Sequence, residues 1–515
     1  MDTEDLYWVS FTLVTIVGFF TFKLLTRHRH FFRARGVAHE KPHFIYGNLK
    51  QVCSGKLSPL EQTADFYQKF KNERIFGFFN YLTPVYYVRD PELIRKLWVH
   101  EFDSFPNHAY FLDESKDPIL GNQLHLLKDE KWRQMRHTLR TVFDGRSVAL
   151  MSPLIRTNSL DLVDHLNASV DPELEFKGIF QKYAFNMIAS CAFGLELNTF
   201  KDESDKFCTY GGALVFGINP VQTVKTMFFY LFPKLMTQMK VRLMEEEHAI
   251  YFMNLFRYTT RDRENKNLSR PDMIQMLHQA NKGERKSEDE VDEFLQMKDF
   301  SKRKWNDEEL VAQCIAFFGT GFEGLVNLFS FAAYELAANP EVQQKLLEEI
   351  ENSLEDSPVV YHTVEKLPYL EMVVSETLRK WPAVSSSDRE CSQDFLLDDE
   401  GLRVQFRKGD TLWVSIWALH RDEDNFPEPD LFDPERFSVA NKGNIKPYTY
   451  MPYGAGPRNC IGMRLVSLAI KITLVDLVKN FKLELGSRMI QPLRLSKTSY
   501  SMEPEGGFWL QMTPR

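Results

Sequence analysis

Several features are scarce in this 515-residue chain, and each absence removes a class of protein. Its six cysteines form no Cys-x-x-Cys pair and follow no regular spacing, which disfavours both a zinc site and a disulfide framework. The net charge of -8 offers no excess of positive charge for binding nucleic acid. No Gly-x-Ser-x-Gly segment is present, and no Gly-x-Gly-x-x-Gly follows a strand-like run. The sequence therefore predicts neither a hydrolase with a nucleophile elbow nor an internal nicotinamide or flavin site.

Aromatic residues, by contrast, are abundant. Phenylalanine alone occurs 42 times, and hydrophobic residues make up 43% of the chain. We therefore expect a large core or pocket that is rich in aromatic rings. The length suits either two average domains or one large domain, and scattered cysteines suit a reducing compartment.

One loop contains the residues on which the functional prediction depends. Residues 451–464 read MPYGAGPRNCIGMR, and an apolar run with helical spacing follows. Cys460 is therefore expected at a helix N-terminus, where free N–H groups and the helix dipole favour thiolate over thiol. A thiolate on such a loop is a good axial ligand for haem iron, whereas the alternative is a free buried cysteine beside a glycine turn. Three flanking glycines allow sharp turns of the backbone: Gly454, Gly456 and Gly462.

The run Tyr453-Gly-Ala-Gly-Pro-Arg-Asn-Cys-Ile-Gly closely resembles the haem-binding loop of the cytochrome P450 family. Tyr453 is a departure, because that family usually has phenylalanine at this position. The resemblance implies a cytochrome P450 fold, mainly α with small β sheets (α+β), and haem b (iron protoporphyrin IX) bound through Cys460. It covers almost the whole chain, and at a finer level it is to insect microsomal enzymes of clan 3, most like family 9.

Four side chains are expected around the haem propionates. Trp132 and Arg136 lie four residues apart and share one face of a predicted helix. The resemblance implies that the Trp132 indole and the Arg136 guanidinium both contact a propionate, and it gives the same role to Arg389 and Arg458. Without the resemblance, Trp132 and Arg136 would be an ordinary surface pair.

One long helix is predicted from Asn306 to Asn339, with Asn306 and Glu309 forming a capping box at its start. Glycines near its middle cost roughly 1 kcal/mol each relative to alanine, which a helix tolerates where another group approaches its backbone. In the resembled family that group is haem with bound dioxygen. The glycines are Gly319, Gly321 and Gly324.

The middle of this helix departs from the family pattern, which is small-Gly-x-acid-Thr. The chain has Thr320-Gly-Phe-Glu323-Gly324, so the acid is present but glycine stands in the threonine position. We hypothesise that Thr320, or a water beside Gly324, organises proton delivery together with Glu323. The alternative is a drifted motif that couples electrons to product less well.

Three phenylalanines of the same helix cannot all face a substrate. Helical spacing places Phe318 and Phe322 on one face, so Phe317 is interpreted as core packing.

Glu376 and Arg379 form a Glu-x-x-Arg pair, and a Pro-Glu-Arg-Phe segment follows at 434–437. The resemblance implies that Arg436 joins Glu376 and Arg379 in a buried cluster behind the haem loop. Its role would be structural, since removing one member leaves an unpaired buried charge.

Residues 6–22 carry no charge, and several basic residues follow them. This run is about as long as a membrane-spanning helix requires, and its basic flank predicts that the body of the protein faces the cytosol. We expect an anchor at 1–26, a basic linker at 27–48 and a catalytic domain at 49–515, on the endoplasmic reticulum membrane. A buried core helix is the alternative.

Short strands are predicted at 75–79, 85–88, 404–406 and 411–414. The polar stretch 269–303, rich in lysine and glutamate, is interpreted mostly as a solvated loop between helices.

The combined interpretation is a monooxygenase that inserts one oxygen atom from O2 into apolar xenobiotics or endogenous lipophilic compounds. Its expected partners are a lipid membrane, NADPH–cytochrome P450 reductase and, as a second electron donor, cytochrome b5, but not nucleic acid. The reductase is expected to dock on the cysteine side, near Arg133, Lys442 and Lys446. Two alternatives remain open: a haem-thiolate isomerase or dehydratase that needs no reductase, and a haem protein that sequesters ligands.

Overall fold

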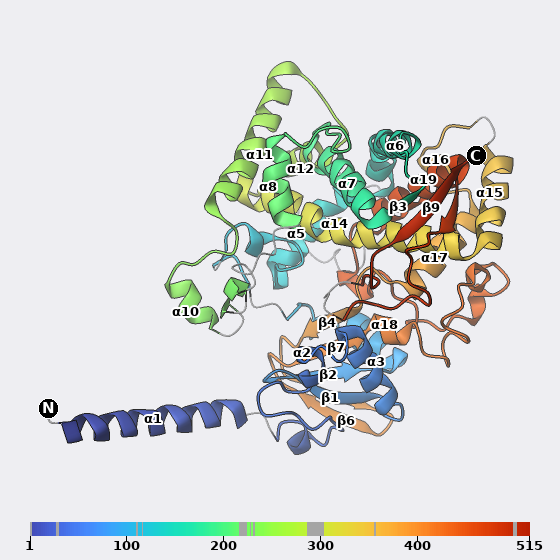
Figure 1. Cartoon of the computed structure of the whole chain (residues 1–515). Helices are drawn as coiled ribbons and strands as arrows, with labels where there is room; N and C mark the ends of the chain where they lie inside the picture. The colour runs from blue at the N-terminus through green and yellow to red at the C-terminus, as the bar shows by residue number, and fades with distance from the viewer. Residues whose placement is uncertain are drawn as a thin grey trace. The chain divides into compact units, whose positions relative to one another are not determined.

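A computed structural model describes residues 3–26, 30–109, 112–115, 117–215, 224–226, 228–229, 232–285, 303–354, 357–497 and 502–515. The chain divides into two compact units, whose elements are labelled in Figure 1. The first unit comprises Met1–Ala109, Ser385–Leu419 and Lys497–Tyr500. The second unit comprises Tyr110–Val384, His420–Ser496 and Ser501–Arg515.

The first unit is built around a four-stranded sheet with the order β1-β2-β7-β4. β1 and β2 form an antiparallel hairpin, β2 pairs with β7 in parallel, and β4 pairs with β7 antiparallel. The aromatic residues of the sequence fill this unit, since the Phe76 ring stacks on Tyr87 of the neighbouring strand and on Phe70. The strands are β1 (Ile75–Asn80), β2 (Thr83–Val88), β4 (Ser386–Glu390) and β7 (Thr411–Ser415), beside a separate hairpin of β5 (Phe395–Asp399) and β6 (Leu402–Phe406).

Short helices complete the first unit. A capping box between Ser58 and Glu61 starts the α3 helix, with Pro59 at its first position. The other helices are α1 (Thr3–Thr26), α2 (Lys50–Cys53), α4 (Pro91–Arg95) and α18 (Ile416–Leu419), and α3 itself is Pro59–Lys69. α1 carries large apolar side chains that are mostly exposed, among them Tyr7, Trp8 and Phe11.

The second unit is mainly helical and has one three-stranded sheet with the order β3-β9-β8. Its strands are β3 (Glu173–Glu175), β8 (Phe481–Leu485) and β9 (Trp509–Pro514). Its helices are α5 (Asp129–Phe143), α6 (Gly145–Asn167), α7 (Phe176–Ile188), α8 (Lys206–Val215), α10 (Pro233–Gln238), α11 (Glu246–Lys266), α12 (Met273–Lys282), α14 (Asp307–Ala338), α15 (Pro340–Leu354), α16 (Tyr361–Val364), α17 (Pro368–Lys380) and α19 (Met463–Asn480).

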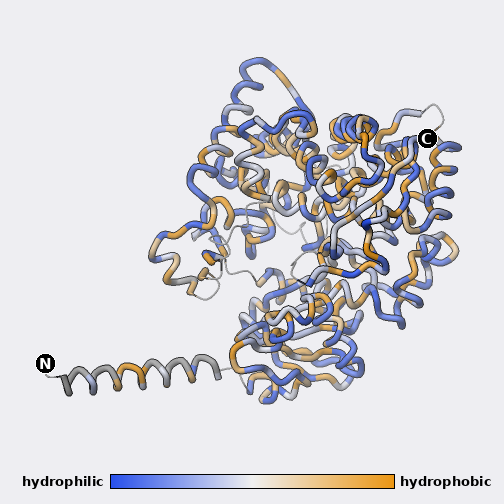
Figure 2. Tube along the Cα trace, viewed as in Figure 1, coloured by the Kyte–Doolittle hydropathy of each residue, from blue (hydrophilic) through white to orange (hydrophobic). Residues whose placement is uncertain are grey.

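The long central helix forms as predicted. α14 begins after Asn306, whose side chain accepts from the Glu309 N–H while Glu309 accepts from the Asn306 N–H. α14 is long and apolar enough to cross a membrane, but 67% of its most apolar window is buried. That burial is expected of the core helix of a globular unit. In the outer α15, hydrophobic and hydrophilic residues alternate along the helix (Figure 2), because one face packs inward through Leu346 and Ile350.

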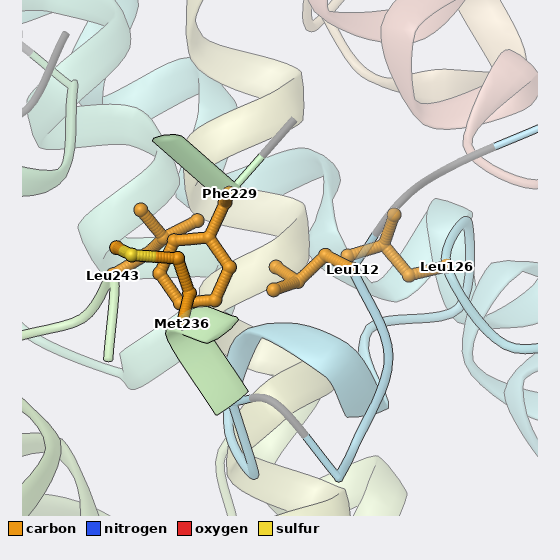
Figure 3. Close-up of a cluster of buried hydrophobic side chains, with 5 residues drawn as sticks. All are labelled: Leu112, Leu126, Phe229, Met236 and Leu243. Carbon is orange, nitrogen blue, oxygen red and sulfur yellow. The ribbon is translucent and has the colours of Figure 1, made fainter. Parts of the chain in front are cut away.

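A small hydrophobic cluster joins two segments of the second unit that are far apart in the sequence. Leu112 and Leu126 come from the segment before α5, and they meet Phe229, Met236 and Leu243 from the segment before α11 (Figure 3). These side chains are at most 8% exposed. The two segments therefore bury their apolar surface against one another.

The predicted class, mainly α with small β sheets, is confirmed, as are all four predicted strands. The interpretation of 269–303 as mostly solvated loop is wrong for its first part. The side chain of Asp272 caps α12, which buries Met273, Ile274 and Leu277. Asp272 also receives two hydrogen bonds from Arg263, at 2.8 and 2.6 Å. Residues 286–302 lie outside the described part, and the division into anchor, linker and catalytic domain stays a prediction.

Candidate functional site

The cysteine loop leads into α19 and is closed by its own backbone. The Gly454 N–H donates to the Met451 carbonyl at 3.0 Å, and the Cys460 N–H donates to the Tyr453 carbonyl at 2.9 Å. Gly454 and Gly456 have φ of 76° and 71°, a region that strongly favours glycine. Gly462 has an ordinary φ of −85°, but a Cβ there would lie 4.0 Å from the Cys460 sulfur. Its small size therefore leaves space beside the thiol.

The Cys460 thiol reaches solvent, yet enough protein surrounds it for burial to dominate its pKa. Burial raises that pKa above its usual value, and the Gly462 N–H, the Arg136 guanidinium and the Met463 N–H oppose the rise only in part. The N–H groups at this helix end favour the thiolate, as expected, but they do not outweigh the effect of burial. A bound metal cation would supply the missing stabilisation, because coordination deprotonates a thiol outright.

Two arginines and a tryptophan surround the cysteine loop. Arg136 of α5 donates to the Asn459 backbone carbonyl at 2.8 Å and to its side-chain oxygen at 2.6 Å, directly before Cys460. Arg458 donates to the Leu127 carbonyl at 2.6 Å. The Trp132 ring is buried, with the Arg136 guanidinium 5.8 Å and the Arg458 guanidinium 4.6 Å from its centre. The chain thus gathers two positive charges beside the thiol, which suits a group that carries carboxylates.

Arg389, the fourth side chain predicted at the propionates, belongs to the first unit and lies on β4. It is buried, donates to the Asp388 carbonyl at 2.7 Å, and has its guanidinium 5.5 Å from the centre of the Trp98 ring. Its predicted contact with a propionate stays a prediction.

The middle of α14 has an open side. Thr320 and Glu323 are exposed, and the Thr320 hydroxyl donates to the Ala316 carbonyl of its own helix at 2.5 Å. Among the described residues, a Cβ on Gly319 or Gly321 would meet no heavy atom of another element within 4 Å. A Cβ on Gly324 would make an ordinary contact of 3.6 Å with the Ala383 side chain. Gly321 and Gly324 belong to the side of Thr320, whereas Gly319, two residues before Gly321, faces away from it. The backbone is therefore accessible to a large group beside Gly321 and Gly324.

The interpretation of the three phenylalanines on α14 is reversed by the structure. Phe318 and Phe322 are buried, and Phe318 packs edge-on against the rings of Phe185 and Phe207. Phe317 is partly exposed and belongs to the same side of the helix as Thr320 and Gly324. Phe317 is therefore the ring that can reach a group beside the open side of α14.

Glu376, Arg379 and Arg436 come together in the second unit. The Arg379 guanidinium makes two hydrogen bonds to the Glu376 carboxylate, at 2.7 and 2.9 Å, and both side chains are fully buried. Arg436 lies 3.5 Å from the same carboxylate. Burial raises the pKa of Glu376 while Arg379 opposes that rise. The three residues form the expected buried charge cluster, and its structural role stays a prediction.

Sequence reasoning missed two residues that contact this region. Asn459 binds Arg136, and the imidazole of His420 accepts a hydrogen bond from the N–H of Met451, where the cysteine loop begins. Asn459 stands within the cysteine-loop motif, but the motif names no partner for it, and His420 belongs to no motif. Each partner lies far away in the sequence, so only the folded chain reveals the contact.

Comparison with known proteins gives one consistent family. The family model described as "Cytochrome P450" matches residues 38–510. The chain is 36% identical over 514 residues to "Cytochrome P450 9b2" of Drosophila melanogaster, with 98% of both chains covered. It is 34% identical over 522 residues to "Probable cytochrome P450 9f2" of the same species, with 99% of both covered. To "Cytochrome P450 9e2" of Blattella germanica it is 34% identical over 538 residues, with 100% of this chain and 99% of the relative covered.

The predicted family and its finer assignment are thereby confirmed. The chain belongs to the cytochrome P450 family of haem b-binding monooxygenases, as a member of the insect family 9 type.

Proposed function

We propose that this protein is a membrane-bound haem-thiolate monooxygenase that oxidises apolar small molecules, either xenobiotics or endogenous lipophilic compounds. The proposal rests on the surroundings of Cys460. Arg136 binds Asn459, the residue directly before Cys460, and Arg458 and Trp132 lie close by. When bound there, an iron porphyrin with an anionic sulfur ligand supplies the chemistry that inserts one oxygen atom from O2 into a C–H or C=C bond.

The residues around Cys460 have distinct tasks in this proposal. Arg136 and Arg458 would pair with carboxylates of the bound haem, and the Trp132 indole N–H would donate to one of them. Asn459 already holds the Arg136 guanidinium through two hydrogen bonds, so this side chain is oriented in advance. The propionate contact of Arg389 rests on the family resemblance. Gly462 keeps the space next to the sulfur open.

Apolar substrates are inferred from the open side of α14. Phe317 is its partly exposed aromatic ring, and the glycines leave the backbone accessible. Glu323 is exposed on the same helix and would supply or relay protons, with Thr320 or a water beside Gly324 completing the path. Because the Thr320 hydroxyl donates to Ala316, its oxygen remains available only as an acceptor.

Electrons would come from NADPH through the separate reductase, with cytochrome b5 as a second donor. Arg133, Lys442 and Lys446 are the candidate docking cations, and Lys442 and Lys446 are exposed. Reversing the charge at Lys442 and Lys446 should raise the reductase concentration needed for half-maximal turnover. Turnover driven by an added peroxide, which bypasses the reductase, is the control that should not change.

Attachment to the endoplasmic reticulum membrane is proposed from α1. This 24-residue helix exposes large apolar side chains, and basic residues follow it in the sequence. The catalytic part would then lie on the cytosolic face. Sedimentation of the full chain with vesicles, compared with a chain that begins after the anchor, tests this part separately.

A second candidate function rests on Gly324, which leaves the family's threonine position without a hydroxyl. A haem-thiolate isomerase or dehydratase that rearranges hydroperoxides would need no reductase and less proton delivery. Substrate turnover that requires NADPH and the reductase supports the monooxygenase, whereas turnover of a fatty-acid hydroperoxide without them supports the alternative.

The decisive measurement is the difference spectrum of the reduced, carbon monoxide-treated protein. We expect the band of a thiolate-ligated haem in the unsubstituted protein and its loss in Cys460→Ser. An unaltered Soret band in Cys460→Ser would overturn the proposal, because the sulfur would then not be the ligand. A screen of apolar compounds with NADPH and reductase should follow.

A further inference from the structure

We infer that His420 is a positioning residue, which fixes the start of the cysteine loop to the buried Glu376–Arg379 pair. This inference rests on the proposed function, because it concerns how the chain places Cys460. His420 is fully buried in the second unit and belongs to none of the groups assigned above.

Both ring nitrogens of His420 bind backbone groups from different parts of the chain. Nδ1 lies 3.0 Å from the Arg379 carbonyl, at the end of α17. Nε2 lies 2.9 Å from the N–H of Met451, at the start of the cysteine loop. The Arg379 guanidinium returns a hydrogen bond to the His420 carbonyl at 3.0 Å. His420 therefore connects α17 and the loop through three hydrogen bonds.

These partners permit only one protonation state. The Met451 N–H can only donate, so Nε2 must be unprotonated, and the Arg379 carbonyl can only accept, so Nδ1 must carry the proton. A charged imidazolium would place two N–H donors against each other at Met451. Burial and the nearby Arg379 charge lower the pKa of His420 to about 3, in agreement with this neutral tautomer.

Packing fixes the plane of the ring. The Tyr450 ring stacks on His420 with centres 5.4 Å apart, and Phe426 approaches edge-on at 6.1 Å. The Tyr450 hydroxyl donates to the Ser375 carbonyl of α17 at 3.0 Å, which anchors the stacked pair on the same helix. These two aromatic contacts and the hydrogen bonds restrict the imidazole to one orientation, and that orientation sets where the Met451 N–H must lie.

The connection continues to the thiol through the loop backbone. The Met451 carbonyl accepts from Gly454, and the Tyr453 carbonyl accepts from the Cys460 N–H. A displacement of Met451 would therefore move the segment that holds the sulfur. The Glu376–Arg379 pair supports the ligand loop through His420, not by contacting Cys460.

Three variants test this inference. His420→Leu keeps the volume but removes both hydrogen bonds, while the amide of His420→Gln offers one donor and one acceptor. His278→Gln, at a surface histidine that binds Glu264, is the matched control. The measurements are haem bound per protein, the fraction of the reduced carbon monoxide complex with thiolate ligation, and backbone hydrogen exchange of residues 446–460.

We expect His420→Leu to convert most of its carbon monoxide complex to the form without thiolate ligation, and His420→Gln to recover much of the normal form. Exchange at Met451 should become on the order of tenfold faster in His420→Gln than in the control, because one hydrogen bond is weakened. If His420→Leu does not fold, the exchange and spectra of His420→Gln decide.

A normal thiolate spectrum in His420→Leu, or unchanged Met451 exchange in His420→Gln, overturns the inference. Rapid exchange of the Met451 N–H in the unsubstituted protein would also overturn it. These outcomes leave the proposed function intact as long as the unsubstituted protein has the thiolate spectrum and Cys460→Ser lacks it.

Discussion

Asp117 accepts a hydrogen bond from the backbone N–H of Met244, with 3.0 Å between Oδ2 and the nitrogen. The other carboxylate oxygen accepts from Ile119 and Leu120, at 3.2 and 3.0 Å. Asp117 is buried, and its partner Met244 directly follows Leu243 of the hydrophobic cluster that Figure 3 shows. Asp117 therefore ties the segment before α5 to the start of α11.

This segment runs from Asp117 to the region of the thiol. Gln313 of α14 donates to the Asn122 carbonyl at 2.6 Å and accepts from the Leu124 N–H at 2.9 Å. Arg458 then binds the Leu127 carbonyl. One end of the segment is thus fixed next to Cys460, and Asp117 fixes the other end.

We predict that Asp117→Ala loosens the outer end of this segment without unfolding the protein. The change leaves three N–H groups without their acceptor, two of them buried, at a cost of about 1–3 kcal/mol for each group that water cannot reach. Proteolysis within 112–127 should become faster, and stopped-flow traces should show faster association of an apolar ligand. Asp113→Ala, which removes an exposed carboxylate bound to Ser115, is the control. Equal rates for the two variants would contradict the proposed restraint.

The Glu376–Arg379 pair gives a stability prediction. Glu376→Gln leaves the buried Arg379 and nearby Arg436 without an anion, and breaking a buried pair typically costs about 3–5 kcal/mol. Denaturant unfolding followed by tryptophan fluorescence should show a large shift to lower midpoint. Glu435→Gln removes an exposed partner of Lys345 and should shift the midpoint by an amount worth less than about 1 kcal/mol. Similar shifts for both variants would show that the buried pair contributes no more to the free energy of unfolding than an exposed pair does.

Short-range patterns explain which elements were predictable. The capping box at Asn306 and the strands at 75–79 and 411–414 depend on neighbouring residues, and they lie where the sequence indicates. α12 was missed because the lysine- and glutamate-rich residues after it dominate the stretch 269–303, and because Asp272 and the buried Arg263 stabilise it through tertiary contacts.

The candidate site was predictable where it has a motif and unpredictable where it has only contacts. Cys460, Trp132, Arg136 and Arg458 lie together in the second unit as their motifs imply. Helical spacing correctly separated Phe317 from Phe318 and Phe322, but it gave no information on which face is buried. His420 has no motif at all, since its partners lie 41 and 31 residues away.

Tyr453 provides a test of the family's usual phenylalanine. Its ring lies in the cysteine loop, and within the described part of the chain its hydroxyl makes no hydrogen bond. Burial raises the pKa of Tyr453 well above its usual value, so this hydroxyl stays neutral. We predict that Tyr453→Phe leaves the free energy of unfolding unchanged or raises it by up to about 1 kcal/mol, because a buried hydroxyl without a partner is costly. The unfolding midpoint measures this change.

Tyr450→Phe is the matched control for that prediction. The Tyr450 hydroxyl donates to the Ser375 carbonyl at 3.0 Å, so its removal should lower stability by about 1 kcal/mol. Each variant removes one buried hydroxyl, and the two positions are three residues apart in the sequence. A loss of stability in Tyr453→Phe as large as that in Tyr450→Phe would mean that the Tyr453 hydroxyl has a partner in solution.

His420 predicts a specific pH dependence of stability. Its pKa is lowered from 6.5 to about 3 in the folded chain, where Arg379 and Arg421 are its charged neighbours. As the pH falls below 6.5, the unfolded chain binds a proton that the folded chain does not, so the free energy of unfolding decreases until the pH approaches 3. At pH 5 the loss should be about 2 kcal/mol relative to pH 7.

Comparing unfolding midpoints of the unsubstituted protein and His420→Gln at pH 7 and pH 5 isolates this effect. Glutamine does not titrate, so the variant should lose less stability between the two pH values, by about the same 2 kcal/mol. His278→Gln should behave like the unsubstituted protein. Parallel pH profiles for the protein and His420→Gln would mean that the imidazole is charged, or accessible, in the folded state.

Compared with the family pattern, Thr320 stands in the position of the small residue and Gly324 in the position of the threonine. These two positions give the prediction closest to catalysis. Thr320→Ala should raise the hydrogen peroxide formed per NADPH, because an acceptor oxygen next to Glu323 is lost. Gly324→Thr should lower it, since the family's hydroxyl returns and its Cβ makes only an ordinary 3.6 Å contact with Ala383. Peroxide, product and NADPH are measured together with reductase and one substrate, and Thr320→Ser is the control that keeps a hydroxyl. Unchanged coupling in Thr320→Ala would eliminate Thr320 from the proton path and leave Glu323 with water beside Gly324.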